Sequence, residues 1–263
     1  MDNLFLIKIP PFFPKYKKWK RYGYSNIKER ENLKNVLEES SEGYCMYCYS
    51  KIRVDGKLHA NLEHAIEKSN SEKLRECIPN IGLACATCNQ SFKRAGEQKR
   101  KLPETQVEKF ETESKCTCEK RKQCTKACKP LRNLQKYYGT LPGGKIIFQP
   151  TGIKGEQTGN ELALEYDALK MQFQPATDTY DYSPEEKIFI QEHIVRFHLN
   201  DPKYKTRQLY EFVRDVVDHN GKIPEHEYDN WVVTQFKKSI QEKSKAEILK
   251  ICRALFCISF LRG

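Results

Sequence analysis

Two pairs of cysteines constrain the fold of this chain more than any other feature of its sequence. Cys45 and Cys48 form one Cys-x-x-Cys motif, and Cys85 and Cys88 form a second. Thiolates at this spacing bind one zinc ion tetrahedrally, and four sulfur ligands leave no open position for a water molecule. The 36 intervening residues exceed the ~15–20 residues of an ordinary zinc ribbon, so we expect an inserted unit between the pairs. A redox function is disfavoured because no βαβ pattern surrounds either motif.

The cysteine content also bears on the cellular compartment. The chain of 263 residues contains 11 cysteines, and its N-terminal segment lacks the layout of a secretion signal. Metal ligation is therefore favoured over disulfide formation, and we expect a cytoplasmic protein. No apolar segment approaches the ~20 residues of a membrane-spanning helix, so no membrane location is expected. The hydrophobic content of 38% is too high for a largely disordered chain.

Positive charge is concentrated in two segments of this chain, whose net charge is +11. Residues 8–30 contain eight Lys/Arg against one acid, and residues 93–136 contain fourteen against six. Concentrated positive charge suits the phosphate backbone of DNA, because each neutralised phosphate releases counterions. The alternatives are a solvated surface and a flexible basic tail. Aromatic side chains in the first segment can stack on bases, although anchoring of the arm to the core is the favoured interpretation.

The sequence pattern predicts an α+β protein with four regions. They are a basic N-terminal arm with a helix (1–42), a small zinc-clipped core (43–96), a basic Cys-rich insert (97–142), and short strands followed by a mostly helical C-terminal region (143–263). Capping residues and apolar periodicity predict helices at 25–40, 184–198, 203–219, 226–242 and 244–261. Strands are expected at Lys145–Gln149 and, as one strand or a hairpin, within Leu162–Phe173.

A further pattern lies between and just after the cysteine pairs. Glu63 and His64 are followed by Asn80, and the second pair is followed by Asn89 and Lys93. This order and spacing resemble the zinc-containing HNH endonucleases, or ββα-metal nucleases, over about 50 residues of the chain. Asn89 stands where histidine is the founding residue, and Glu63 stands where aspartate or histidine is commoner. The resemblance implies a ββα-metal nuclease core at residues 43–96 that hydrolyses phosphodiester bonds of DNA.

The chemistry of these residue types agrees with that activity. A neutral histidine can take a proton from water at physiological pH, so His64 is the candidate general base. A carboxylate and an amide oxygen can hold Mg2+ or Mn2+, so Glu63 and Asn89 are the candidate ligands of a catalytic metal ion. The resemblance implies that Asn80 fixes the loop that orients the histidine.

Two of these assignments depend on local geometry. Adjacent residues on a strand point to opposite faces, so Glu63 and His64 can share a site only where the strand ends or bends. Lys93 follows Asn89 by four residues and shares its face on a helix. We expect Lys93 to contact phosphate; the alternative is an ordinary solvated helix lysine.

A second cluster of four cysteines lies in the basic insert, at Cys116, Cys118, Cys124 and Cys128. Four close thiols in a reducing compartment favour a second structural zinc ion. Basic residues surround these thiols, and the candidates for DNA contacts are Lys120, Arg121 and Lys122. The alternatives are a flexible insert with free thiols and an iron–sulfur ligand set of unfamiliar spacing.

Two longer segments are similar to the PtuB-like HNH proteins of Septu and retron-associated anti-phage systems. They are the run from GYCMYC through EHAIEKS to NIGLACATCNQSFK, and the stretch IQEHIVRFHLNDPKYKTRQLYEFVRD. This resemblance implies the nuclease effector of a bacterial defence complex, working beside an ATPase of the ABC or SMC type. The apolar last helix, AEILKICRALFCISFL, either fills its own core or docks on a partner. The alternative function is a non-catalytic, zinc-stabilised nucleic-acid-binding or assembly subunit.

Overall fold

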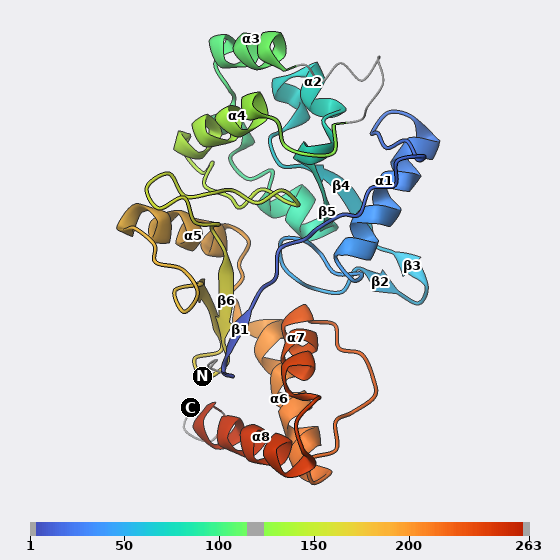
Figure 1. Cartoon of the computed structure of the whole chain (residues 1–263), viewed down its shortest axis with the longest axis vertical. Helices are drawn as coiled ribbons and strands as arrows, with labels where there is room; N and C mark the ends of the chain where they lie inside the picture. The colour runs from blue at the N-terminus through green and yellow to red at the C-terminus, as the bar shows by residue number, and fades with distance from the viewer. Residues whose placement is uncertain (1–3, 115–123, 260–263) are drawn as a thin grey trace.

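The computed structural model describes residues 4–114 and 124–259 of the chain. Helices and short strands are mixed along the sequence, as expected for an α+β protein. Figure 1 shows an elongated arrangement in which residues of the first half form the upper part and the last three helices form the lower part. A small sheet and the extended N-terminal segment lie between these two parts (Figure 1).

An antiparallel hairpin lies at the centre of the upper part. Its strands are β4 (Ala60–His64) and β5 (Ile81–Cys85). The apolar sequence of β5 is almost wholly buried, which makes this strand part of the core. Ala60 pairs with Cys85, and His64 pairs with Ile81. The cysteine-bearing end of β5 and His64 therefore lie at opposite ends of the hairpin.

Short helical segments connect and follow the two strands. The connection contains η1 (Lys68–Asn70), α2 (Glu72–Arg75) and η2 (Ile78–Asn80). A π-helical segment, η3 (Thr87–Phe92), follows β5. A separate small hairpin of β2 (Arg53–Val54) and β3 (Lys57–Leu58) precedes β4. Two strands followed by a helical segment are thus present in the predicted core, although the helical segment is short.

The predicted N-terminal helix is confirmed as α1 (Ile27–Ser40). The side chain of Asn26 accepts a hydrogen bond from the backbone N–H of Glu29 and caps the helix. Leu33 and Leu37 are completely buried on the inner side of α1, which packs against β5. The basic insert adds η4 (Glu97–Arg100), α3 (Glu104–Glu113) and α4 (Lys129–Thr140), and α3 packs against α4.

The predicted hairpin in the second half of the chain is confirmed as β6 (Leu164–Asp167) and β7 (Gln172–Pro175). The N-terminal strand β1 (Leu6–Lys8) completes an antiparallel sheet of order β1-β6-β7. Phe12, just beyond β1, stacks on Trp231 at a ring distance of 5.1 Å. The favoured interpretation of the arm as anchored to the core is therefore confirmed, although no local sequence pattern predicts that its partner is the C-terminal region.

The prediction of a strand at Lys145–Gln149 is wrong. This segment is buried, yet it has no strand partner among the described residues. The backbone N–H of Ile147 donates to the ring nitrogen Nδ1 of His193 at 3.0 Å. A side chain thus takes the hydrogen bond that a neighbouring strand would otherwise accept.

The predicted C-terminal helices are present as α5 (Pro184–Arg196), α6 (Pro202–Asp218), α7 (Trp231–Ile240) and α8 (Lys245–Ser259). Ser183 and Glu186 form a capping box at the start of α5. Helix α7 begins later than residue 226 because Asn230 caps it, accepting a hydrogen bond from Val232. Helix α8 packs against α6. No helix in the described part of the chain is long and apolar enough to cross a membrane.

Candidate functional site

The four cysteines of the two Cys-x-x-Cys motifs come together in the fold. The sulfur atoms of Cys45, Cys48, Cys85 and Cys88 all lie within 4.8 Å of one another. The Sγ atoms of Cys48 and Cys85 are 3.8 Å apart, which matches the spacing of about 3.8 Å that a tetrahedron with ~2.3 Å zinc–sulfur bonds requires. These residues therefore fit a zinc ion with four thiolate ligands.

Backbone groups also support this cluster. The N–H of Cys85 donates to the sulfur of Cys45 at 3.3 Å, and the N–H of Cys88 donates to the sulfur of Cys85 at 3.4 Å. Burial raises the pKa of the Cys45 thiol well above its ordinary range, so a thiolate at this residue would be costly without a cation. A zinc ion would join the loop after α1 to the end of β5 and stabilise the base of the hairpin.

His64 is the last residue of β4, and its ring is held by two neighbours. Its Nε2 lies 3.0 Å from the backbone carbonyl oxygen of Arg75. A carbonyl oxygen only accepts hydrogen bonds, so Nε2 carries the proton and Nδ1 carries the free lone pair. The ring of Tyr24 packs edge-on against the imidazole, with 4.7 Å between the ring centroids.

The environment of His64 keeps its ring neutral. The residue is 7% exposed. Burial lowers the pKa of His64 to about 4, and the positive charges of Lys68 and Lys93 add to this effect. At physiological pH the imidazole is therefore an uncharged hydrogen-bond acceptor at Nδ1.

Asn80 holds the segment that follows His64. Its Oδ1 accepts a hydrogen bond from the backbone N–H of Ile66 at 2.9 Å, and its Nδ2 donates to the carbonyl of Ile66 at 2.8 Å. The backbone carbonyl of Asn80 also accepts from the N–H of Ala65 at 2.8 Å. Asn80 is completely buried. This geometry agrees with the loop-fixing function that the resemblance implies for Asn80.

Glu63 points away from the histidine. Its carboxylate accepts a hydrogen bond from the hydroxyl of Tyr47 at 2.6 Å and lies 3.5 Å from the ammonium of Lys93. The side chain of His64 shares neither partner, as expected for neighbours on a strand. Burial raises the pKa of Glu63, and this effect outweighs the opposing charge of Lys93.

Asn89 is not joined to either residue. It lies in η3 and is half-buried, and its side chain has no hydrogen-bond partner among the residues that the structure describes. No contact in the described part of the chain joins the side chains of Glu63, His64 and Asn89 to one another. Glu63 and Asn89 stay the predicted ligands of a catalytic metal ion.

The position of Lys93 differs from the predicted one. It is 3% exposed, with its ammonium 3.0 Å from a carboxylate oxygen of Glu67 and 3.4 Å from the backbone carbonyl of His64. A lysine buried among these acceptors is neither solvated nor placed to contact phosphate. The expected phosphate contact does not agree with this position, because two buried carboxylates hold the ammonium inside the protein.

Lys93 belongs to a buried polar cluster that no local sequence pattern indicates. The hydroxyl of Tyr138 donates to the Glu67 carboxylate, at 2.7 and 2.9 Å from its two oxygens. Arg100, 1% exposed, donates from Nε to Glu67 at 3.1 Å and to Tyr138 at 2.8 Å. Glu67 and Tyr138 are 71 positions apart in the chain, so no local pattern signals the contact. The cluster attaches α4 to the segment after His64.

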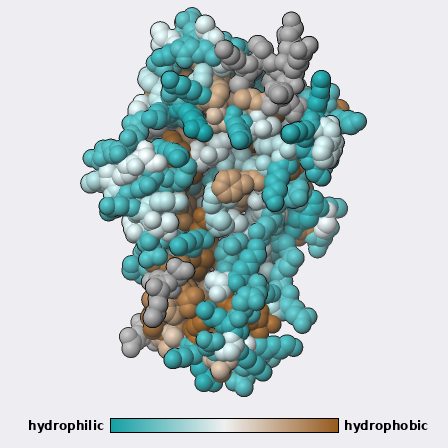
Figure 2. All heavy atoms as spheres, viewed as in Figure 1, coloured by the Kyte–Doolittle hydropathy of each residue, from teal (hydrophilic) through white to brown (hydrophobic). Residues whose placement is uncertain are grey.

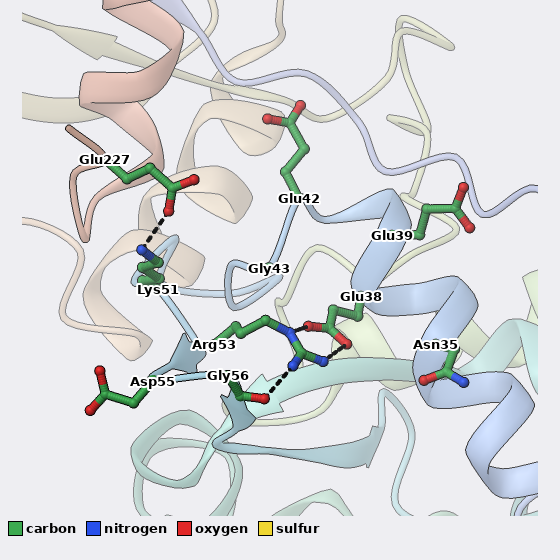
Figure 3. Close-up of a pocket in the computed structure, with 10 residues that line it drawn as sticks. All are labelled: Asn35, Glu38, Glu39, Glu42, Gly43, Lys51, Arg53, Asp55, Gly56 and Glu227. Carbon is green, nitrogen blue, oxygen red and sulfur yellow. Dashed lines mark hydrogen bonds and ion pairs between the residues drawn. The ribbon is translucent and has the colours of Figure 1, made fainter. Parts of the chain in front are cut away.

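Two hollows with opposite charge lie on the surface of the upper part. One is lined by Ser69, Asn70 and the segment after η3, including the cations Arg94, Lys99 and Lys101 and the acid Glu97. It suits an anion. The other lies between α1 and the β2–β3 hairpin and is lined mainly by acids (Figure 3).

The acidic hollow contains two internal ion pairs. Arg53 pairs with Glu38 and also donates to the carbonyl of Gly56, while Lys51 pairs with Glu227 at 2.7 Å (Figure 3). Both cations are therefore neutralised within the hollow. Its remaining acids make it unsuitable for a phosphate backbone.

The second cysteine cluster falls largely outside the described residues. Cys116, Cys118, Lys120, Arg121 and Lys122 lie there, so their predicted metal and DNA contacts stay predictions. Cys124 and Cys128 are described and half-buried. The Cys124 thiol donates to the backbone carbonyl of Lys126 at 3.2 Å.

Comparisons with protein-family models, with curated proteins and with solved structures found no match for this chain.

Proposed function

We propose that the protein is a metal-dependent endonuclease that hydrolyses phosphodiester bonds of DNA, with His64 as its general base. The observation that carries this proposal is the hydrogen bond between His64 Nε2 and the carbonyl of Arg75. It leaves Nδ1 as the basic nitrogen, and the lowered pKa keeps the ring neutral. A neutral imidazole of fixed tautomer can accept the proton of a water molecule that attacks phosphorus.

Neighbouring residues support this function by orienting the histidine. Asn80 binds both backbone groups of Ile66, which limits movement of the chain just beyond His64. The Tyr24 ring restricts rotation of the imidazole on its other side. The zinc-binding cysteines act at the far end of the hairpin and stabilise the strands without taking part in the reaction.

Mg2+ or Mn2+ is proposed as the Lewis acid that polarises the scissile phosphate. Glu63 and Asn89 stay its predicted ligands. Phosphate binding is assigned to the basic hollow beside η3 in place of Lys93. Arg94, Lys99 and Lys101 are exposed there, whereas Lys93 is buried.

The proposal is tested by plasmid cleavage in Mg2+ or Mn2+, comparing the wild type with His64→Ala. Loss of a positioned general base typically lowers a rate by ~10²–10⁴-fold. The matched control is His59→Ala, because His59 is an exposed histidine in the same part of the chain. The control is expected to cleave like the wild type, and all three proteins are expected to retain the same zinc content.

Equal cleavage by the wild type and His64→Ala would show that His64 is not the general base. A wild type that binds DNA without cutting it in either metal would instead support the second candidate, a zinc-stabilised nucleic-acid-binding or assembly subunit. One observation favours that candidate: the Glu63 carboxylate is engaged by Tyr47 and Lys93. Action beside a partner ATPase in anti-phage defence stays a prediction, tested by co-purification from the native host.

A further inference from the structure

The N-terminal arm presents a basic turn at residues 15–21, which we call the arm tip. Its sequence is KYKKWKR, with five cations and no acid. The side chains of all five cations are exposed. No other segment of seven described residues has this combination of charge and an exposed indole, because the second tryptophan, Trp231, is only 2% exposed.

Trp19 is the most exposed large hydrophobic side chain in the described part of the chain, at 80%. It lies between Lys18 and Lys20, with its ring in water. The other aromatic residue of the tip, by contrast, serves as an anchor. Tyr16 is half-buried and packs edge-on against the buried Tyr22, with ring centroids 5.0 Å apart.

The arm tip is held in shape at both ends. The backbone N–H of Lys17 donates to the Tyr22 hydroxyl at 2.9 Å, and the N–H of Lys20 donates to the carbonyl of Lys17 at 3.1 Å. On the far side, the Asn32 side chain in α1 donates to the carbonyl of Arg21 at 2.9 Å. A turn that is ordered beforehand loses little conformational freedom when it binds a ligand.

The arm also leads directly to the candidate base. Tyr24, whose ring packs on His64, follows Trp19 by five residues. Five residues span at most about 18 Å. This distance corresponds to about five nucleotide steps of ~3.4 Å along one strand. A nucleic acid strand that passes His64 can therefore reach Trp19.

Charge is segregated along α1. The arm tip lies before its N-terminus, and the acidic hollow lies near its C-terminus, about 20 Å away for a helix of 14 residues. On the face of the molecule that Figure 2 draws, hydrophilic residues cover most of the upper part, and larger hydrophobic areas lie lower down. A polyanion is thus favoured at the arm tip and repelled at the other end of the helix.

We infer that Trp19 stacks on an unpaired base of a single-stranded nucleic acid, while the cations of the arm tip contact its phosphates. The faces of bases inside a duplex are covered by their neighbours, whereas an unpaired base offers a free face to an aromatic ring. The inference names the substrate class of the proposed nuclease: nucleic acid with unpaired bases near the cleaved bond. Only this link to cleavage rests on the proposed function.

Binding is measured by fluorescence anisotropy without divalent metal, in the His64→Ala background, with a labelled single-stranded oligodeoxynucleotide and its duplex. Trp19→Ala is expected to weaken single-strand binding by about 5- to 150-fold and to affect the duplex far less. The control Ile27→Ala removes another apolar side chain, which is 77% exposed. It is expected to change neither the affinity for the single strand nor the affinity for the duplex. Replacing Lys17, Lys18 and Lys20 by Gln is expected to lower the slope of log affinity against log salt by about 2.

A second measurement follows the fluorescence of Trp19 itself, and it needs no comparison of binding affinities between variants. The chain has two tryptophans, so Trp231→Phe leaves Trp19 as the sole indole reporter. Its fluorescence is expected to be quenched by the single strand. An RNA strand of the same sequence tests whether the sugar matters, and Trp19-dependent binding of either strand supports the inference. Unchanged single-strand binding by Trp19→Ala, or equal losses for single strand and duplex, would overturn it. If Trp19 binds the strand but the wild type cuts nothing, the proposed function fails while this inference stands.

Discussion

The side-chain amide of Asn80 forms hydrogen bonds with both backbone groups of Ile66, at 2.9 and 2.8 Å. One buried side chain thus takes the place that a neighbouring strand would have in pairing with this residue. The contact connects the end of η2 to the segment just after β4, which leads away from His64. The position of the candidate base therefore depends on a side chain that does not touch its ring.

Replacing Asn80 by Ala is expected to destabilise the protein. The change leaves the N–H and carbonyl of Ile66 without partners in a buried place, and each such group costs about 1–3 kcal/mol. We expect the free energy of unfolding to fall by about 2–4 kcal/mol, measured by urea unfolding followed by circular dichroism. Asn89→Ala is the control, because Asn89 has no hydrogen-bond partner among the described residues. Similar losses of unfolding free energy for the two variants would contradict a stabilising function of the Asn80–Ile66 hydrogen bonds.

Zinc content is expected to depend on the clustered cysteines. Cys45→Ser should lose one zinc ion per chain and unfold the hairpin region, because zinc binding at such sites supplies much of the folding free energy. Cys257→Ser, at an exposed position on α8, should retain the zinc content of the wild type. Elemental analysis and native mass spectrometry measure both results. A folded Cys45→Ser protein with full zinc content would exclude the four-thiolate site.

A second zinc ion is predicted at Cys116, Cys118, Cys124 and Cys128. The same analysis of Cys124→Ser is expected to show one zinc ion fewer than the wild type, with the overall fold kept. A wild-type protein that binds a single zinc ion would exclude the second zinc site.

Stability is expected to depend on pH through His64. Burial lowers its folded-state pKa to about 4, below the value of about 6.5 for an unfolded chain. Between these values the unfolded state binds a proton that the folded state does not, so stability falls as pH falls. The contribution is fully present above about pH 6.5, and the loss reaches up to about 3 kcal/mol near pH 4.

The variant His64→Gln tests this pH dependence. Glutamine can still donate to the Arg75 carbonyl, but it does not titrate. Urea unfolding across the acid range should therefore give a flatter dependence of unfolding free energy on pH for the variant. Two parallel curves would show that His64 titrates normally in the folded protein.

The buried cluster around Glu67 predicts a difference between two adjacent tyrosines. Tyr138→Phe removes a hydroxyl that lies 2.7 and 2.9 Å from the Glu67 carboxylate oxygens, and hydrogen bonds to charged groups contribute about 1.5–3 kcal/mol. Tyr137→Phe is the control, because its hydroxyl has no partner among the described residues. Thermal and urea unfolding should show a loss for Tyr138→Phe alone. Equal effects would mean that the cluster does not hold α4 to the core.

Several elements could be predicted because their signals are local. The Cys-x-x-Cys spacing brings two sulfurs together in any tight turn, so two such motifs predict a four-cysteine cluster that could hold a zinc ion. Ser183 and Glu186 lie three positions apart and form the capping box that starts α5. Each cysteine pair and the capping box belong to one short segment, whose geometry varies little between proteins.

Other features depend on the packing of distant segments. Pairing of β1 with β6 joins the N-terminal arm to a strand in the second half of the chain. Burial of Lys93 depends on carboxylates supplied by β4 and the loop beyond it. Strand alternation predicts that Glu63 and His64 point to opposite faces, but it does not predict their partners, Tyr47 and Arg75.

Local spacing therefore predicted the cluster of four thiols, whereas the chemical function of His64 and Asn80, which the family resemblance implies, stays a prediction. It could not predict which way the charged groups turn. A lysine or glutamate can be buried only where opposite charges from other segments compensate for lost hydration. That compensation comes from contacts across tens of residues, and these form only when the whole core packs.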